Sequence, residues 1–145
     1  MEGRCNCGAV RFIIHGQLPA MYQCHCTLCR RQGGAGSNAA TIVELEAFSW
    51  KQGQEAINTW TKASGFNAHF CSNCGSPVPN PLGDRYMWIP VGLLEESDRG
   101  DTRIVAQLWL DAKAHWDQPP ESLRNYPAMP EDLEEFIHFL HQPQD

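Results

Sequence analysis

Three cysteines lie within six residues in the segment Cys24-His25-Cys26-Thr27-Leu28-Cys29. Thiols this close together cannot all act as core packing or as mutually bonded disulfides. The spacing is typical of thiolates gathered around one soft or borderline metal ion, of which zinc suits the donor set best. Any fold that this chain adopts therefore has to hold these three side chains together.

The other four cysteines form two close pairs, Cys5/Cys7 and Cys71/Cys74. Seven is an odd number, and a Cys-x-Cys pair closes too small a ring for an easy disulfide. The opening residues lack the apolar run of a signal peptide, so we expect a cytoplasmic, reducing environment and metal-bound thiolates. The seven cysteines divide most simply into one site of four ligands and one of three, but their spacing leaves open which cysteines share the site of four. A set of four would be closed and structural, whereas a set of three leaves one position open.

Composition narrows the class of protein. A length of 145 residues with 42% hydrophobic and 19% charged residues predicts one globular domain over residues 1–145. The formal net charge of −6 argues against a nucleic-acid partner. No segment approaches the ~20 apolar residues that a membrane-spanning helix needs, so we expect no membrane partner.

Apolar alternation and frequent glycine and proline predict a mainly β fold of short strands with a single helix at the C-terminus. The helix is expected at about 131–141, where acidic residues in the first turn precede an apolar stripe. A metal-binding turn is expected over 3–8, where Gly3 and Gly8 let the backbone bend, and Gly75 is expected to relieve the strain of the turn at Cys71 and Cys74. A surface loop is expected over 95–101. The expected strands are 10–14, 21–23, 39–45, 48–50, 56–61, 86–91 and 104–110, and residues 67–70 lead from a turn into the last cysteine pair.

Several residues beside the central cysteines are candidates for function. Arg30 and Arg31 could pair with substrate carboxylates or could be solvated surface residues. His25 should point away from the metal if its two neighbours point towards it. The glycine-rich segment 32–38 could form an anion-binding nest or a mobile connection, and the sequence leaves both open.

The cysteine motifs resemble those of the glutathione-dependent formaldehyde-activating enzyme family. The resemblance rests on Gly3-Arg-Cys5-Asn-Cys7-Gly8, Cys24-His-Cys26-Thr-Leu-Cys29-Arg30-Arg31 and Phe70-Cys71-Ser-Asn-Cys74-Gly75, with later matches extending it over residues 3–117. It implies an Mss4-like zinc-binding β-sheet fold. It also implies a structural zinc on Cys5, Cys7, Cys71 and Cys74, and a second, catalytic zinc on Cys24, Cys26 and Cys29.

The family's reaction joins glutathione to formaldehyde, so the resemblance implies a carbon–sulfur lyase with a small-molecule thiol substrate. Arg30 is then a candidate catalytic residue beside the three cysteines. Two alternatives belong to other classes of protein. One is a non-enzymatic zinc module that binds a protein partner, and the other is a metal-free redox protein that uses Cys26 and Cys29.

Overall fold

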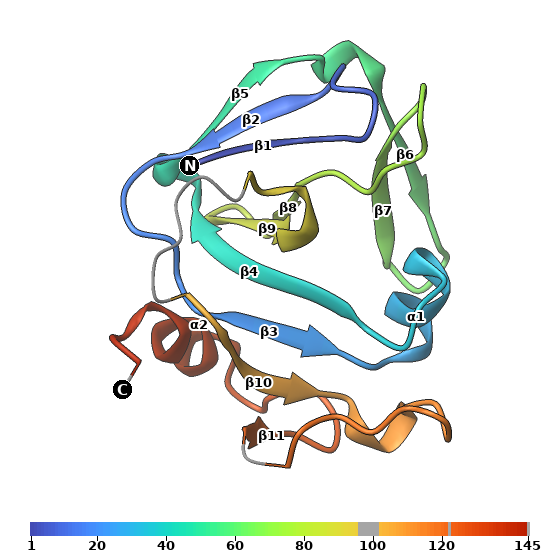
Figure 1. The fold of residues 1–145 in the computed structure, drawn as a ribbon, viewed down its shortest axis with the longest axis vertical. Helices are drawn as coiled ribbons and strands as arrows, with labels where there is room; N and C mark the ends of the chain where they lie inside the picture. Colours follow the sequence, from blue (N-terminus) through green and yellow to red (C-terminus); the bar gives the residue numbers. More distant parts are fainter. Residues whose placement is uncertain (96–101, 122, 145) are drawn as a thin grey trace. The chain divides into compact units, whose positions relative to one another are not determined.

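The computed structural model describes residues 1–95, 102–121 and 123–144. The chain forms two compact units that alternate along the sequence: Met1–Leu18 with Ile42–Gly100, and Pro19–Thr41 with Asp101–Asp145. The described residues contain eleven short strands and two α-helices, so the expected mainly β class is confirmed (Figure 1). The single domain stays a prediction, and the loop expected over 95–101 lies, apart from Glu95, outside the described residues.

The first unit contains three groups of strands. One sheet has the strand order β1 (Glu2–Arg4), β2 (Arg11–Ile14) and β5 (Phe48–Gln52). A second pairs β6 (Ile57–Thr61) with β7 (Asn67–Cys71). In the third, β9 (Tyr86–Pro90) lies between β8 (Asn80–Leu82) and the end of β4 (Asn38–Glu44). The alternation expected around residues 10–14 is confirmed, because Phe12 and Ile14 of β2 are buried between half-buried neighbours. The Phe12 ring stacks on Phe48, with ring centroids 5.6 Å apart.

Gly3 has a different role from the one expected. It belongs to β1 and pairs with Phe12 of β2, so it does not bend the backbone of a turn. A Cβ atom at this position would overlap the buried Phe12 ring. The glycine is therefore needed for close packing, and the turn begins only after β1.

Replacing Gly3 with alanine is expected to lower the free energy of unfolding by about 1–3 kcal/mol, because the Phe12 ring has to move within a packed core. Gly92→Ala in the same unit is the matched control, since its Cβ would meet nothing within 4 Å. The control should change stability by less than about 0.5 kcal/mol. Urea denaturation measures both, and equal midpoints for the two variants would contradict this role of Gly3.

The second unit is centred on β3 (Met21–Cys24). This strand runs parallel to β10 (Ile104–Leu108) on one side and antiparallel to β4 on the other (Figure 1). A short strand, β11 (Arg124–Asn125), continues the sheet beyond β10. The sheet places the end of β3, and therefore Cys24, between two neighbouring strands.

The C-terminal helix α2 (Leu133–His141) confirms the expected helix and begins at Leu133. Asp132 caps it, with Oδ1 accepting a hydrogen bond from the Glu135 N–H at 3.1 Å. Its apolar face is buried within the second unit, where Phe136 meets the Tyr22 ring edge-on at 5.3 Å. Among the described residues no helix is long and apolar enough to cross a membrane.

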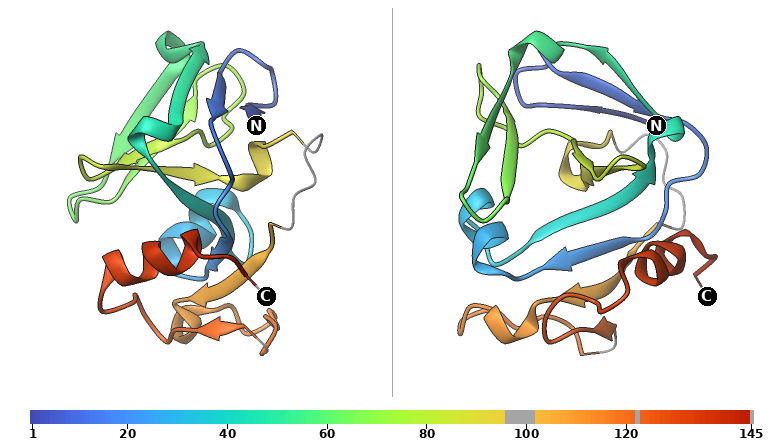
Figure 2. Two further views of the ribbon diagram at one scale, coloured as in Figure 1. Left: turned by 90° about the vertical axis from the view of Figure 1, so that its left-hand side faces the viewer. Right: turned by 180° about the vertical axis from the view of Figure 1, so that it is seen from behind.

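The expectation that only the C-terminus is helical is wrong, because helix α1 (Thr27–Gly33) follows β3 directly (Figures 1 and 2). Cys26 occupies its N-cap, where Sγ accepts from the Cys29 N–H at 3.3 Å. Gly34, with φ of 64°, ends the helix by donating its N–H to the Arg30 carbonyl. A cysteine is not among the usual capping residues, and the following glycines are typical of a loop, so this short helix could not be predicted from the sequence.

Candidate metal centres

The structure brings Cys5, Cys7, Cys71 and Cys74 together in the first unit, with all Sγ atoms within 4.8 Å of one another. The Sγ atoms of Cys5 and Cys7 are 3.6 Å apart, and those of Cys7 and Cys71 are 3.8 Å apart. A tetrahedral zinc ion with Zn–S distances of about 2.3 Å separates its sulfur ligands by about 3.8 Å. The cluster therefore fits a metal ion of this size and geometry.

Both pairs of this four-cysteine cluster lie in turns of the same kind. The Cys5 N–H donates to the carbonyl of the residue five positions later at 3.1 Å, and the Cys71 N–H does the same at 2.9 Å. Each turn contains a glycine with φ of 76°, Gly8 in the first and Gly75 in the second. Both glycines are needed because side chains disfavour this left-handed conformation, as the sequence predicted.

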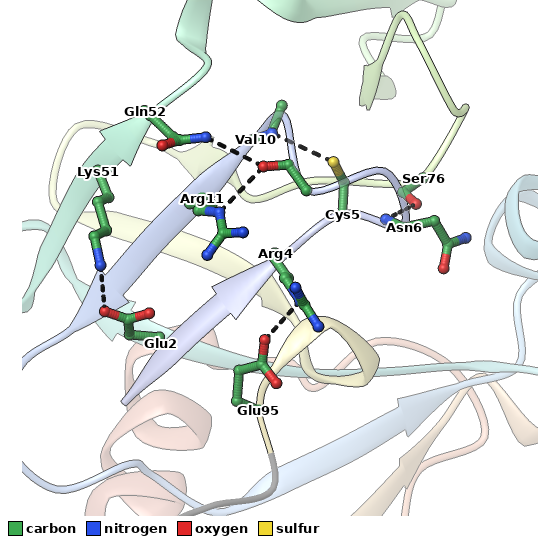
Figure 3. A network of polar contacts seen from close by, with 11 residues as sticks. Glu2, Arg4, Cys5, Asn6, Val10, Arg11, Lys51, Gln52, Ser76 and Glu95 are labelled. Atoms are coloured by element: carbon green, nitrogen blue, oxygen red, sulfur yellow. Dashed lines mark hydrogen bonds and ion pairs between the residues drawn. The ribbon is translucent and has the colours of Figure 1, made fainter.

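Polar contacts at Cys5 and Cys74 favour thiolates, whereas the pKa of Cys7 is raised to about 11; Figure 3 shows the contacts of Cys5 and Ser76. The Val10 N–H donates to Cys5 Sγ at 3.3 Å. Ser76 Oγ accepts from the Asn6 N–H at 3.0 Å and lies 3.4 Å from Cys74 Sγ. The hydrogen bond with Ser76 lowers the pKa of Cys74 to about 5. Ser76 thus links the two turns and supports the charged form that a metal ion requires.

The second cluster consists of Cys24, Cys26 and Cys29, whose Sγ atoms also lie within 4.8 Å of one another. Cys24 is the buried last residue of β3, Cys26 caps α1, and Cys29 lies one turn into that helix. Among the described residues no further histidine, cysteine or carboxylate joins this three-cysteine cluster. The cluster can therefore hold a metal ion and leaves one tetrahedral position to another ligand.

Protons are unevenly shared within the three-cysteine cluster. Hydrogen bonds from Cys24 and then Cys29 lower the pKa of Cys26 to about 2. The same contact with Cys26 raises the pKa of Cys24 to about 11, and contacts with Cys24 and Cys26 raise that of Cys29. The directions of these shifts favour a thiolate at Cys26 and protonated thiols at Cys24 and Cys29 before a metal ion binds.

Metal uptake by this cluster is expected to release about two protons, because Cys24 and Cys29 must both lose theirs. Since the raised pKa values keep these protons bound at neutral pH, apparent affinity should rise with pH, by about 100-fold per unit. Calorimetric titration with zinc in buffers of different protonation enthalpy counts the protons, once the four-cysteine cluster has been filled. Release of no protons would contradict this distribution.

The side chain of His25 contacts Gln107 and Asp117 and is not part of the cluster of thiols. Its side chain is 1% exposed, and Nε2 is hydrogen-bonded to Gln107 Oε1. Nδ1 lies 3.3 Å from Asp117 Oδ2, an ion-pair distance without hydrogen-bond geometry. The ring is not part of the cluster of ligand atoms, in agreement with the expectation that it points away from the metal site.

The two arginines differ in their surroundings. Arg30 is half-buried and donates from Nη1 to the Ala112 carbonyl at 3.1 Å, whereas Arg31 is exposed. Arg30 Nε is buried and has no hydrogen-bond partner among the described residues. The guanidinium of Arg30 therefore ties α1 to residue 112, and its contact with a substrate stays a prediction.

The ends of the segment 32–38 belong to the two elements that flank it. Its first residues complete α1 and its last, Asn38, begins β4 opposite Cys24. A Cβ at Gly36 would lie 2.7 Å from Asp117 Oδ2, so this glycine permits close approach of a carboxylate of the same chain. An anion nest at this segment stays a prediction.

Sequence reasoning missed three polar residues: Ser76 at the four-cysteine cluster, and Gln107 and Asp117 beside His25. Gln107 could have been noticed, because it is the polar residue within the otherwise apolar run Ile104–Leu108. In the structure it is fully buried, which is unusual for a glutamine. Ser76 and Asp117 lie in loops, where a single polar residue carries no signal of its own.

Fold and clusters together define a mainly β protein with two separate cysteine clusters, each able to hold a metal ion. The family model for the glutathione-dependent formaldehyde-activating enzyme matches residues 1–112. The chain belongs to this family.

Individual relatives agree with the assignment. A protein of Halomonas elongata described as a putative glutathione-dependent formaldehyde-activating enzyme is 34% identical over 86 residues, and the match spans 54% of each chain. The chain thus covers about half the length of that relative. A crystal structure of a Rhodobacter sphaeroides protein shares the fold, with a TM-score of 0.55 and 23% identity, over 72% of this chain and 100% of its own.

Proposed function

We propose that this protein is a zinc-dependent enzyme of the carbon–sulfur lyase class that activates a thiol, of the glutathione type, for addition to formaldehyde or another small carbonyl. The observation that carries the proposal is the three-cysteine cluster, which offers three thiolates and leaves one tetrahedral position open. The name of the family and the description of the Halomonas elongata protein suggest the class of substrate.

The two clusters take different roles in this proposal. Cys5, Cys7, Cys71 and Cys74 hold a structural zinc ion, because four thiolates close its coordination. Cys24, Cys26 and Cys29 hold the catalytic ion. A zinc ion held by these three thiolates would leave a fourth position for a substrate thiol and would lower the pKa of that thiol, keeping its sulfur nucleophilic.

The reaction is an addition that needs no oxidant. A bond forms between the thiol sulfur and the carbonyl carbon, the carbonyl π bond breaks, and the thiol proton ends on the new hydroxyl oxygen. Holding both small reactants together provides much of the rate gain. Arg30 and Arg31 lie next to Cys29 in α1 and would offer positive charge to the carboxylates of a glutathione-type thiol.

Exchange NMR with ¹³C-formaldehyde and glutathione tests the proposal, because it measures how fast free formaldehyde and the thiol adduct interconvert. The zinc-loaded protein should accelerate the exchange above the uncatalysed rate. S-methylglutathione, which lacks the thiol, is the matched control and should give no adduct. No acceleration with glutathione or with a small thiol, while both clusters hold zinc, would instead favour a zinc module that binds a protein partner.

A further inference from the structure

Four polar side chains of the second unit, Asp117, His25, Gln107 and Gln23, contact one another in a row that begins next to the three-cysteine cluster. We call this row the polar chain. Asp117 Oδ2 is 3.3 Å from His25 Nδ1, His25 Nε2 is hydrogen-bonded to Gln107 Oε1, and Gln107 Nε2 donates to Gln23 Oε1 at 2.8 Å. The two central members are almost completely removed from solvent, with exposures of 1% for His25 and 0% for Gln107. Buried polar groups of this kind destabilise a fold unless each finds a partner.

Strand register places this polar chain opposite to the thiol of Cys24. Gln23 of β3 is aligned with Gln107 of β10, and their side chains share one face of the sheet. Cys24 follows Gln23 and points to the other face, whereas His25 joins the face of Gln23 and Gln107. The His25 N–H also donates to the Leu108 carbonyl at 2.9 Å, which continues the pairing of β3 with β10 beyond Cys24.

The hydrogen bonds fix the orientation of each group. Because Gln107 Nε2 donates to Gln23, its Oε1 faces His25 and accepts from the ring Nε2–H. The other ring nitrogen faces the Asp117 carboxylate. The imidazole is thus held by a hydrogen bond at Nε2 and faces a carboxylate at Nδ1, without hydrogen-bond geometry there. Rotating the backbone between Cys24 and Cys26 would break the buried hydrogen bond to Gln107.

We infer that this polar chain positions the thiolates of the three-cysteine cluster and so controls how tightly the cluster retains its metal ion. The inference rests on the proposed function, which places a zinc ion there. His25, Gln107 and Asp117 are positioning residues, because their contacts are with one another and not with the clustered Sγ atoms. Partners that orient metal ligands typically change metal affinity by 10–100-fold when removed.

The direct test is Gln107→Leu, which keeps a similar volume and removes both hydrogen bonds of the side chain. Thr41→Val is the matched control, because Thr41 Oγ1 makes one buried hydrogen bond in the same unit, to the Ala20 carbonyl at 2.8 Å. Zinc affinity of the three-cysteine cluster is measured by competition with a chromophoric chelator. The absorption spectrum of the cobalt-substituted protein reports the thiolate geometry.

Gln107→Leu should weaken zinc binding at this cluster by about 10–100-fold and change the cobalt spectrum. Thr41→Val should lower the unfolding midpoint but keep the affinity and the spectrum of the wild type. Gln107→Glu still offers His25 an acceptor and should retain most of the affinity. Wild-type affinity in Gln107→Leu, or an equal loss in Thr41→Val, would overturn the inference.

A second variant decides the question if Gln107→Leu does not fold. Asp117 has a side chain that is 26% exposed, so Asp117→Ala should fold, and because it removes the oxygen that faces His25 Nδ1 it should also weaken zinc binding. Unchanged affinity in this variant would overturn the inference. Wild-type protein that binds no zinc at the three-cysteine cluster would remove the proposed function itself, whereas tight wild-type binding with insensitive variants removes only the positioning role.

Discussion

Cys71→Ser is expected to unfold the first unit. Cys71 is 0% exposed and packs in a buried cluster with Val10 and Val78, so its sulfur is both a core atom and a candidate ligand. Structural zinc contributes about 10–16 kcal/mol to the folding of small zinc-binding peptides. This is comparable to the whole stability of an average domain, about 5–15 kcal/mol, and the loss of one ligand forfeits much of it.

Near-ultraviolet circular dichroism and urea denaturation measure this loss of fixed tertiary structure. Treating the wild type with a strong zinc chelator should reproduce it, which separates metal loss from the change in packing at residue 71. Cys29→Ser, in the other cluster, is the control and should keep the tertiary signal. A Cys71→Ser protein with the urea midpoint of the wild type would show that the four-cysteine cluster does not stabilise the fold.

Cys29→Ser is expected to reduce adduct exchange by more than about 100-fold, because a direct ligand matters more than the neighbouring groups that typically cost 10–100-fold. Its backbone N–H, which donates to Cys26 Sγ at 3.3 Å, is kept in the variant, so α1 should still form. The measurement is the exchange rate at saturating zinc, beside the far-ultraviolet circular dichroism spectrum.

The control for this variant is Gln32→Ala, an exposed position of the same helix. It should retain wild-type exchange, which would assign the loss to the thiol and not to a disturbed helix. Cys29→Ser with exchange close to that of the wild type would contradict a catalytic role for the three-cysteine cluster.

Much of the strand pattern could be predicted from the sequence, because alternating burial leaves a clear trace in β2 and a short apolar run marks the more deeply buried β9. Helix α1 could not be predicted, since a cysteine serves as its cap and only a fold that gathers the three thiols explains it. The role of Gly3 was hidden for a similar reason. Its constraint comes from the Phe12 ring across a strand pair and not from its own backbone conformation.

The candidate ligands could be predicted from cysteine spacing and resemblance, whereas their polar surroundings could not. Gln107 and Asp117 are more than eighty residues from His25 along the chain, and only the pairing of β10 with β3 and the approach of residue 117 bring them near it. For Arg30 the sequence position could be predicted but the contact could not. Its position beside Cys29 was evident, but its bond to the Ala112 carbonyl depends on a distant segment.

Zinc content by elemental analysis, for the wild type and Cys29→Ser, tests most directly the claim that the chain holds one closed and one open metal centre. We expect about two zinc ions per chain in the wild type and about one in Cys29→Ser, with the fold retained in both. One zinc ion in each protein would contradict the claim, because the three-cysteine cluster would then hold no metal ion.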